Sequence, residues 1–181
     1  MVSPKYFLIF TFISLTSILS SNPNAQKSQN LINNICSQTL NPSQCSEYLQ
    51  QLYRNGDSLQ TLTQKTIPYT SKFLFLIYDE IRVREIQSIK NPTLNKIYHK
   101  CGEAYTAATN TVNESQTVLQ SGDYQKLLSL ASNALNQAQS CSKNFGMGES
   151  EPSDFKSLDL KGQNVCSIVL AMSKQLLAGK V

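Results

Sequence analysis

Five cysteines are the residues of this chain whose type and spacing most directly predict chemistry. An odd number in a chain with a secretory leader, described below, predicts two disulfides and one unpaired thiol, and four paired cysteines allow three connectivities. Only nine positions separate Cys36 from Cys45, so local closure of this pair is the least costly choice. That choice leaves Cys101 to pair with Cys141. Cys166 stands among apolar residues, which predicts a buried thiol; a bridge to a second copy of the chain is the alternative.

Residue types that catalyse reactions are sparse in the rest of the chain. His99 is the only histidine, and we interpret it as a solvated residue at the start of a helix rather than a general base or metal ligand. The carboxylate pairs Asp79/Glu80 and Glu149/Glu151 are expected on a helix surface and on a mobile loop, whereas acid–base catalysis needs two carboxyl groups that converge in a cleft. His, Cys, Asp and Glu nowhere cluster at the spacing of metal ligands. These patterns predict no catalytic site, no metal and no cofactor, so the chain is not expected to be an enzyme.

The cysteines Cys101 and Cys141 are placed symmetrically about the turn Ser121-Gly122-Asp123. Cys101 lies 20 residues before Ser121, and Cys141 lies 19 residues after Gly122. Apolar and small residues recur at steps of three and four on both flanks, which predicts two helices. If the helices fold back on each other, a rise of about 1.5 Å per residue brings both thiols to the same height, roughly 30 Å from the turn. A disulfide at that height would clamp the open end of a helical hairpin.

The same spacing predicts helices along the rest of the chain. Asn41-Pro42 and Asn91-Pro92 mark breaks, because the residue before a proline is displaced from helical geometry. Pro68 falls inside a pattern that resumes in phase, so we expect a kink there. No segment alternates apolar and polar residues for long enough to be a strand. The expected helices are Gln29–Thr39, Ser43–Tyr53, Asp57 or Ser58 to about Lys90, Thr93–Gln120, Asp123–Phe145 and Ser157–Ala178. Short connections between long amphipathic helices predict an all-α fold, an antiparallel four-helix bundle with an N-terminal helical hairpin and two disulfides.

The first 25 residues have a pattern of their own. Lys5 is followed by an apolar run from Tyr6 to Leu19 and then by small and polar residues up to Ala25, which is the order of a secretory signal peptide. An uncleaved membrane anchor is the alternative, but the run is shorter than the roughly 20 apolar residues of a membrane span. We therefore expect residues 1–25 to be a signal peptide and residues 26–181 to be one secreted, extracellular domain. The longest later apolar stretch, residues 73–78, is too short to cross a membrane.

The net charge of the chain argues against a nucleic-acid partner. Loss of Lys5 with the leader takes the formal net charge from +4 to +3, and no long run of Lys or Arg occurs. A nucleic-acid-binding protein needs a concentrated basic face, so no nucleic-acid partner is expected.

Asn113-Glu114-Ser115 is the only Asn-x-Ser/Thr sequence not interrupted by proline. Because Asn113 lies off the apolar stripe of its helix, it is a candidate glycosylation site.

All five cysteines stand within longer motifs. The chain reads INNICSQTLNPSQC at 32–45, CGEAY at 101–105, SGDY at 121–124, CSKNF at 141–145, and DLK followed by CSIVL within 159–170. In these motifs, and over nearly all of residues 26–181, the chain resembles the plant invertase and pectin methylesterase inhibitor family. The resemblance implies an antiparallel four-helix bundle with an N-terminal hairpin and two consecutive disulfides. It also implies a protein that inhibits an enzyme.

One branch of this family inhibits acid invertases of the wall or vacuole, and the other inhibits pectin methylesterase in the cell wall. The SGDY turn at 121–124 stands where invertase inhibitors typically carry Pro-Lys-Phe, and Cys166 in the last helix also resembles the pectin methylesterase branch. The resemblance thus implies a secreted cell-wall inhibitor, monomeric when free, that forms a noncovalent one-to-one complex with pectin methylesterase and blocks its pectin-binding groove. An inhibitor of acid invertase is the first alternative, and a secreted helical bundle without an enzyme target is the second.

By the same resemblance, the target enzyme meets a bundle face that is rich in carboxylates. Glu103 and Asp123 match that pattern and are the expected target contacts. Ala107, Asn110 and Lys143 stand where further carboxylates are expected, and Lys143 reverses the sign of the charge. Charges at the rim of an interface act mainly on the rate of association. We therefore expect that inhibition either survives with an altered target preference or is lost.

Overall fold

The computed structural model of the chain describes residues 23–146 and 149–179, and all regular structure within these ranges is helical. This confirms the predicted all-α class. The helices are α1 (Pro23–Cys36), α2 (Pro42–Leu52), α3 (Leu59–Gln87), α4 (Pro92–Ser121), α5 (Tyr124–Phe145) and α6 (Ser153–Leu177).

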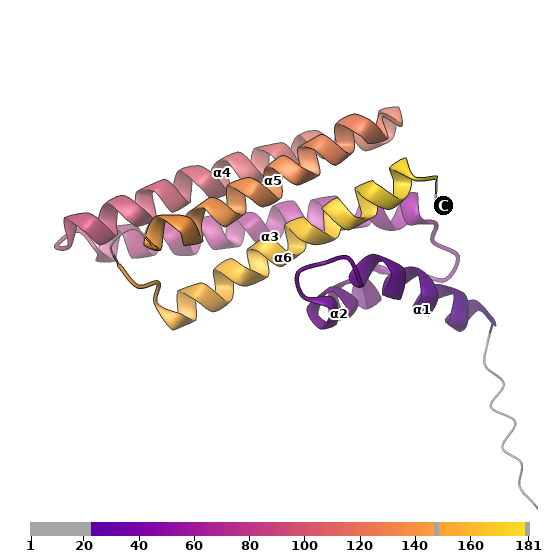
Figure 1. Ribbon diagram of the computed structural model, residues 1–181, viewed down its shortest axis with the longest axis horizontal. Coiled ribbons are helices and arrows are strands. Elements are labelled where there is room, and N and C mark those ends of the chain that lie inside the picture. The colour runs from indigo at the N-terminus through magenta and orange to yellow at the C-terminus, as the bar shows by residue number, and fades with distance from the viewer. Residues whose placement is uncertain (1–22, 147–148, 180–181) are drawn as a thin grey trace, which may run out of the picture.

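The four long helices form an antiparallel bundle, and the two short ones form a separate hairpin. Helices α3, α4, α5 and α6 run alternately up and down along the long axis of the molecule, so that each connection lies at one end of the bundle (Figure 1). Helix α4 packs against both α3 and α5, and α6 closes the bundle against α5 and α3. The hairpin of α1 and α2 lies beside α6 at the end where α3 begins. This is the predicted four-helix bundle with an N-terminal hairpin.

Side-chain caps fix the starts of four helices. Asn41, Ser58, Asn91 and Asp123 each accept a hydrogen bond from the backbone N–H three residues further on, at the start of α2, α3, α4 and α5 respectively. Such caps satisfy backbone donors that have no partner inside the helix. Gly122 ends α4 with a positive φ of 75°, a conformation that glycine adopts at little cost. The sharp turn between α4 and α5 therefore follows from two adjacent residues.

Two helices begin earlier than the sequence pattern predicts. Helix α6 begins at Ser153 instead of Ser157, because Phe155 is fully buried and its ring contacts those of Tyr98 and Phe145. Helix α1 begins at Pro23 instead of Gln29, and proline suits the first turn of a helix. The start of α1 thus lies inside the predicted signal peptide. Most of that segment, residues 1–22, is outside the described residues, so its role as a leader stays a prediction.

Two disulfides join the helices as the spacing of the cysteines predicts. Cys36 pairs with Cys45 inside the N-terminal hairpin, and Cys101 pairs with Cys141 between α4 and α5. Cys166 is unpaired and 1% exposed, and burial raises the pKa of its thiol to about 12. A thiol that is buried and protonated is a poor nucleophile, so a bridge from Cys166 to a second copy would require the bundle to open.

Polar side chains of α6 attach the hairpin to the bundle. Asn164 Oδ1 accepts a hydrogen bond from the backbone N–H of Asn41 at 2.9 Å, and Asn164 Nδ2 donates to Gln44 Oε1 at 2.9 Å. Further along α6, Gln175 Nε2 donates to the backbone oxygen of Asn34 at 2.8 Å. All three contacts join the hairpin to the last helix, more than 100 positions away in the sequence.

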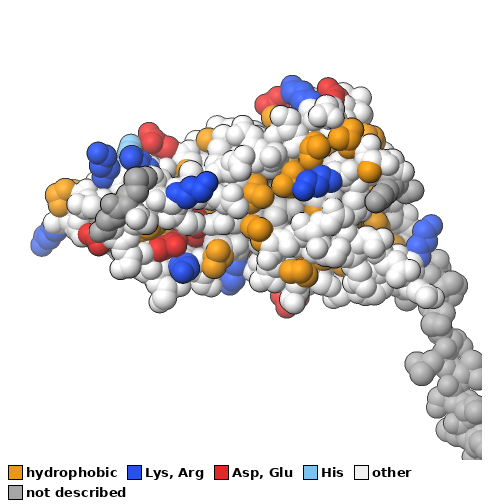
Figure 2. Space-filling model, viewed as in Figure 1, with side chains coloured by type: hydrophobic (Ala, Val, Ile, Leu, Met, Phe, Trp, Pro, Cys, Tyr) orange, Lys and Arg blue, Asp and Glu red, His pale blue; other side chains and the backbone are white. Residues whose placement is uncertain are grey.

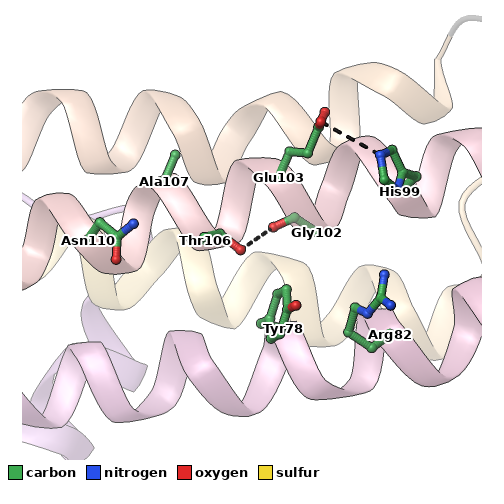
Figure 3. A pocket seen from close by; sticks show the side chains of 8 residues that line it. All are labelled: Tyr78, Arg82, His99, Gly102, Glu103, Thr106, Ala107 and Asn110. Carbon is green, nitrogen blue, oxygen red and sulfur yellow. Dashed lines mark hydrogen bonds and ion pairs between the residues drawn. The ribbon is translucent and has the colours of Figure 1, made fainter.

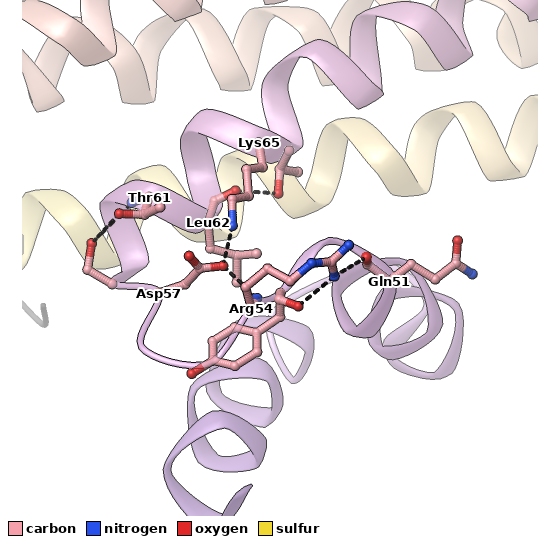
Figure 4. A network of polar contacts seen from close by, with 9 residues as sticks. Gln51, Arg54, Asp57, Thr61, Leu62 and Lys65 are labelled. Atoms are coloured by element: carbon pink, nitrogen blue, oxygen red, sulfur yellow. Dashed lines mark hydrogen bonds and ion pairs between the residues drawn. The ribbon is translucent and has the colours of Figure 1, made fainter. Parts of the chain in front are cut away.

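A second polar network holds the connection between α2 and α3 (Figure 4). Asp57 Oδ2 accepts from the backbone N–H of Arg54 at 2.7 Å and from Lys65 Nζ at 2.6 Å. Arg54 Nη1 donates to the backbone oxygen of Gln51 at 3.0 Å, near the end of α2. Burial opposes ionisation of Asp57, but these hydrogen bonds prevail and lower its pKa. The orientation of the hairpin is therefore fixed at both of its junctions with the bundle.

Candidate functional site

An open groove runs between α3 and α4. Its first hollow, of about 390 Å³, lies between Tyr78 and Arg82 of α3 and Gly102, Thr106 and Asn110 of α4. Figure 3 shows Tyr78 and Arg82 pointing from α3 toward α4. Side-chain hydroxyl and amide groups thus line this hollow beside an aromatic ring.

The groove continues along both helices through two further hollows. Phe75, Tyr78 and Asn110 line the second hollow, of about 250 Å³. Phe75 also lines the third hollow, of about 400 Å³, together with Pro68 and Asn113. We call these three connected hollows the α3–α4 groove. The exposed ring of Phe75 lies where the second and third hollows meet.

Glu103, one of the two predicted target contacts, stands at the rim of the first hollow. Its side chain is 70% exposed, and its Oε1 lies 3.7 Å from His99 Nε2 (Figure 3). His99 Nδ1 lies 2.9 Å from Glu85 Oε1 on α3. His99 is exposed, as expected for a solvated residue, but it lies inside α4 rather than at a helix start, and its ring stands between carboxylates of α3 and α4. The rim of the groove therefore carries a cluster of one imidazole and two carboxylates rather than an isolated acid.

Asp123, the second predicted contact, lies far from Glu103. Twenty positions along α4 and its turn correspond to about 30 Å. Asp123 Oδ1 accepts from the backbone N–H of Lys126 at 2.9 Å, so the carboxylate caps α5. The structure therefore does not bring the two acids into one site; they mark the two ends of an elongated surface.

The structure also shows where the three positions lie at which the resemblance implies carboxylates that this chain lacks. Ala107 and Asn110 follow Glu103 at steps of four and three residues, so they share its face of α4. Lys143 is exposed in the last turn of α5, where a cation interacts favourably with the helix dipole. The face of α4 that contains Glu103 is therefore less acidic than the resemblance implies.

A buried carboxylate, which the sequence pattern did not identify, lies behind this surface. Asp159 of α6 is 0% exposed and accepts hydrogen bonds from Tyr105 Oη at 2.7 Å, Ser142 Oγ at 2.6 Å and Gln163 Nε2 at 2.6 Å. Burial raises its pKa, and the three hydrogen bonds oppose that change. The network joins α4, α5 and α6 beside the Cys101–Cys141 bridge. The available signal was the position of Asp159 on the apolar stripe of α6, three residues before Gly162.

Side chains of α3 and α4 approach α6 closely at Gly162, beside the same network. A Cβ atom on Gly162 would lie 2.6 Å from both Tyr105 Oη and Ile77 Cδ1. Only a residue without a side chain allows Tyr105 to reach Asp159 at this point. Gly162 therefore positions the hydroxyl that binds the buried carboxylate.

Glu151, expected in solvent on a loop, is half-buried instead. Its Oε1 is enclosed and finds no hydrogen-bond partner among the described residues. Burial, followed by the charge of Asp159, raises the pKa of Glu151 to about 7. The other member of the predicted pair, Glu149, accepts a hydrogen bond from Asn91 Nδ2 at 3.3 Å. The expectation of two solvated carboxylates is thus wrong for Glu151, because the loop packs it against the end of the bundle.

The described residues form neither a metal site nor a membrane span. Within residues 23–146 and 149–179, no group of three His, Cys, Asp or Glu side chains is placed to hold a metal ion. Over the same ranges, no helix combines the length and the apolar character needed to span a membrane. On the face shown in Figure 2, Lys and Arg side chains are scattered among polar and acidic groups rather than gathered into one basic surface.

Comparison with known proteins gives one consistent answer. A family model described as plant invertase/pectin methylesterase inhibitor matches residues 30–172. A pectinesterase inhibitor of Actinidia deliciosa is 29% identical over 186 residues, which cover 98% of this chain and 96% of the relative. Pectinesterase inhibitor 2 of Arabidopsis thaliana is 28% identical over 160 residues, which cover 88% of this chain and 90% of the relative.

Solved structures agree with the sequence relatives. The crystal structure of mutant form A of a pectin methylesterase inhibitor from Arabidopsis superposes with a TM-score of 0.69 at 26% identity, over 79% of this chain and 95% of that chain. A second crystal structure of a pectin methylesterase inhibitor from Arabidopsis thaliana gives a TM-score of 0.61 at 25% identity. These likenesses confirm the helical bundle fold. Since the family model spans most of the sequence, the chain belongs to the plant invertase/pectin methylesterase inhibitor family.

Proposed function

We propose that this chain inhibits pectin methylesterase by forming a noncovalent one-to-one complex that covers the pectin-binding groove of the enzyme. One observation carries the proposal: relatives named pectinesterase inhibitor align over almost the whole chain and almost the whole relative. The SGDY turn at 121–124, which differs from the Pro-Lys-Phe of invertase inhibitors, supports the same target.

The surface that we assign to the target runs along α4 from Glu103 to the turn at Asp123. Both carboxylates are exposed, and the backbone that carries them is fixed on its buried side by contacts with other helices. The Cys101–Cys141 bridge and the Asp159 network fix α4 against α5 and α6. A rigid surface loses little conformational entropy when it binds, so this frame favours a stable complex without any covalent step. The absence of catalytic function follows from the same proposal, since the chain acts by occupying the groove of another protein.

Secretion is the second part of the proposal. The order of residues in 1–25 supports a cleaved signal peptide, and the two disulfides support an oxidising compartment such as the cell wall. The inhibitor domain is then residues 26–181, monomeric when free and paired with one enzyme when bound.

A paired inhibition assay tests the target. Purified residues 26–181 are added to several plant pectin methylesterases at mildly acidic pH, and methanol release from pectin is measured. In parallel the same protein is added to an acid invertase, and sucrose hydrolysis is measured. The proposal predicts a one-to-one titration of esterase activity and no loss of invertase activity. Inhibition of invertase alone would assign the chain to the alternative branch, which the family model also includes. Loss of neither activity at micromolar concentrations would leave a helical bundle without either target.

A further inference from the structure

The motif Asn113-Glu114-Ser115 lies on α4 beside the third hollow of the α3–α4 groove. Asn113 is exposed, and its Oδ1 accepts a hydrogen bond from Ser71 Oγ of α3 at 2.6 Å. This bond turns the side chain of Asn113 toward α3. It engages the amide oxygen and not Nδ2, which is the atom that an N-linked glycan uses.

The hollow beside Asn113 has the size and lining to hold a sugar. Its volume is about 400 Å³, and Pro68 and Phe75 contribute apolar surface to it. The Phe75 side chain is 53% exposed, which is unusual for a phenylalanine. Gln116 also lines the hollow, and its Oε1 is enclosed without a hydrogen-bond partner among the described residues. The hollow therefore offers exposed apolar surface to a sugar, whereas Gln116 Oε1 is closed to it.

We propose that Asn113 carries an N-linked glycan whose first N-acetylglucosamine lies in this hollow against Phe75. The C–H face of a hexose is apolar and packs well on an aromatic ring, while its hydroxyl and amide groups donate hydrogen bonds. The sugar covers the exposed ring and fills the third hollow.

The attachment is an ordinary glycosyl transfer, and it rests on the proposed secretion of the chain. Asn113 Nδ2 forms a bond to C1 of the first N-acetylglucosamine of a lipid-pyrophosphate-linked oligosaccharide. The bond from C1 to the pyrophosphate oxygen breaks, the lipid pyrophosphate leaves, and Nδ2 loses one proton. Ser115 is buried in the folded chain, so the transfer takes place on the nascent chain before α4 packs.

Asn113 lies midway between the two proposed target contacts, Glu103 and Asp123, so the glycan stands beside the surface assigned to the target. Asn113 lies ten positions beyond Glu103, which corresponds to about 15 Å along the helix. Asn113 also points toward α3, whereas Glu103 is on the rim facing solvent. The sugar thus covers the Phe75 end of the groove and leaves Glu103 free.

The first experiment measures occupancy. The full chain is expressed in a glycosylating eukaryotic culture, once with its own leader and once with a leader of known function, so that failed secretion is separated from failed glycosylation. The mass of the secreted protein is measured before and after treatment with peptide N-glycosidase. We expect a loss of one glycan from the unaltered chain and none from Asn113→Gln or Ser115→Ala. A secreted, folded chain without a glycan overturns the proposal.

The second experiment measures where the sugar lies. Hydroxyl-radical oxidation of Phe75 is compared between the glycoprotein, Asn113→Gln, and glycoprotein trimmed by an endoglycosidase to a single N-acetylglucosamine. We expect oxidation of Phe75 to fall severalfold in both the full and the trimmed glycoprotein. Ile86 is 68% exposed on the same helix but lines none of the three hollows, so its oxidation should not change. Equal oxidation of Phe75 in all three samples would show that the sugar does not occupy the hollow.

Discussion

Acidic side chains of this chain occupy two contrasting regions. Glu103 and Asp123 stand in solvent along α4 and its turn, and each has few partners. Asp159 and Glu151 lie where α4, α5 and α6 meet, and Asp159 is wholly enclosed by donors from three helices. Carboxylates in the first region are the proposed recognition groups, whereas the carboxylate of Asp159 in the second region holds the frame.

The difference follows from the solvent around each group. An exposed ion pair contributes about 0–1 kcal/mol, because water screens it. Removal of one partner from a buried polar network costs several times more, since the groups left behind are unsatisfied. We therefore expect that surface charges can differ from those that the resemblance implies, as at Ala107, Asn110 and Lys143, without loss of the fold. Target preference and stability should then be separable properties of the molecule.

The largest effect is expected for Asp159→Ala. The change leaves Tyr105, Ser142 and Gln163 without their acceptor, and we expect the free energy of unfolding to fall by roughly 3–5 kcal/mol. Chemical denaturation followed by circular dichroism measures it. Asp154→Ala is the matched control, because Asp154 is exposed and forms its ion pair with Arg84 at the surface. Equal losses for the two variants would remove the distinction between the regions.

A smaller effect is expected for Gly162→Ala. The added methyl group would meet Tyr105 Oη at 2.6 Å, so the hydroxyl must withdraw from Asp159. Overpacking of this kind costs about 1–3 kcal/mol. Gly102→Ala is the control, since a methyl group there meets only ordinary contacts at 3.7 Å and 3.8 Å and improves helix propensity. Denaturation curves should therefore move in opposite directions for the two glycines.

The dependence of stability on pH should come from Glu151 in part. Its pKa of about 7 in the folded chain lies above the value of about 4.3 expected in the unfolded chain. The folded state therefore binds the proton more tightly, so the stabilisation is fully present below about pH 4 and is lost as the pH rises through 7. We expect the thermal midpoint to decrease as the pH is raised from 5 to 8.

Asp159 also has a raised pKa, so it changes the stability with pH in the same direction. Glu151→Gln removes the contribution of Glu151 alone and so separates the two. The variant should lose part of the pH dependence, whereas Glu149→Gln should keep all of it. Identical pH profiles for the unaltered chain and Glu151→Gln would contradict the assignment.

The smallest effects are expected from conservative changes in the exposed region. Glu103→Gln should slow association with the target enzyme severalfold, and more so at low salt, without a change in thermal stability. Asp123 needs more care, because its carboxylate also caps α5. Asp123→Asn keeps a cap and removes the charge, whereas Asp123→Ala also costs about 1 kcal/mol of stability. Stopped-flow measurement of association at two salt concentrations separates the charge effect from the cap effect.

Local patterns predicted most of the fold. Steps of three and four residues gave the long helices, and Asn-Pro pairs gave their breaks, because both signals act within a few residues. The start of α6 at Ser153 escaped prediction, since its first turn is held by Phe155 contacts with residues distant in sequence.

The site was less predictable than the fold. Glu103 could be selected from its motif, but its pairing with His99 and the groove beside it depend on how α3 meets α4. For Asp159 the sequence offers only its place on the apolar stripe of α6, and for Glu151 it offers no signal, because the enclosing helices are distant in sequence or meet only in the assembled bundle. Burial of a charge is a property of the assembled bundle.

A comparison of two separate variants, Glu103→Lys and Asp79→Lys, as inhibitors of pectin methylesterase tests whether the target binds the α4 surface. Both variants reverse one exposed carboxylate, but Asp79 lies on α3 and lines none of the hollows. We expect Glu103→Lys to bind the enzyme roughly tenfold more weakly, which corresponds to about 1.4 kcal/mol, and to keep an unchanged thermal midpoint. Asp79→Lys should inhibit the enzyme as well as the unaltered chain does. Equal inhibition by both variants would contradict the assignment of the α4 surface to the target.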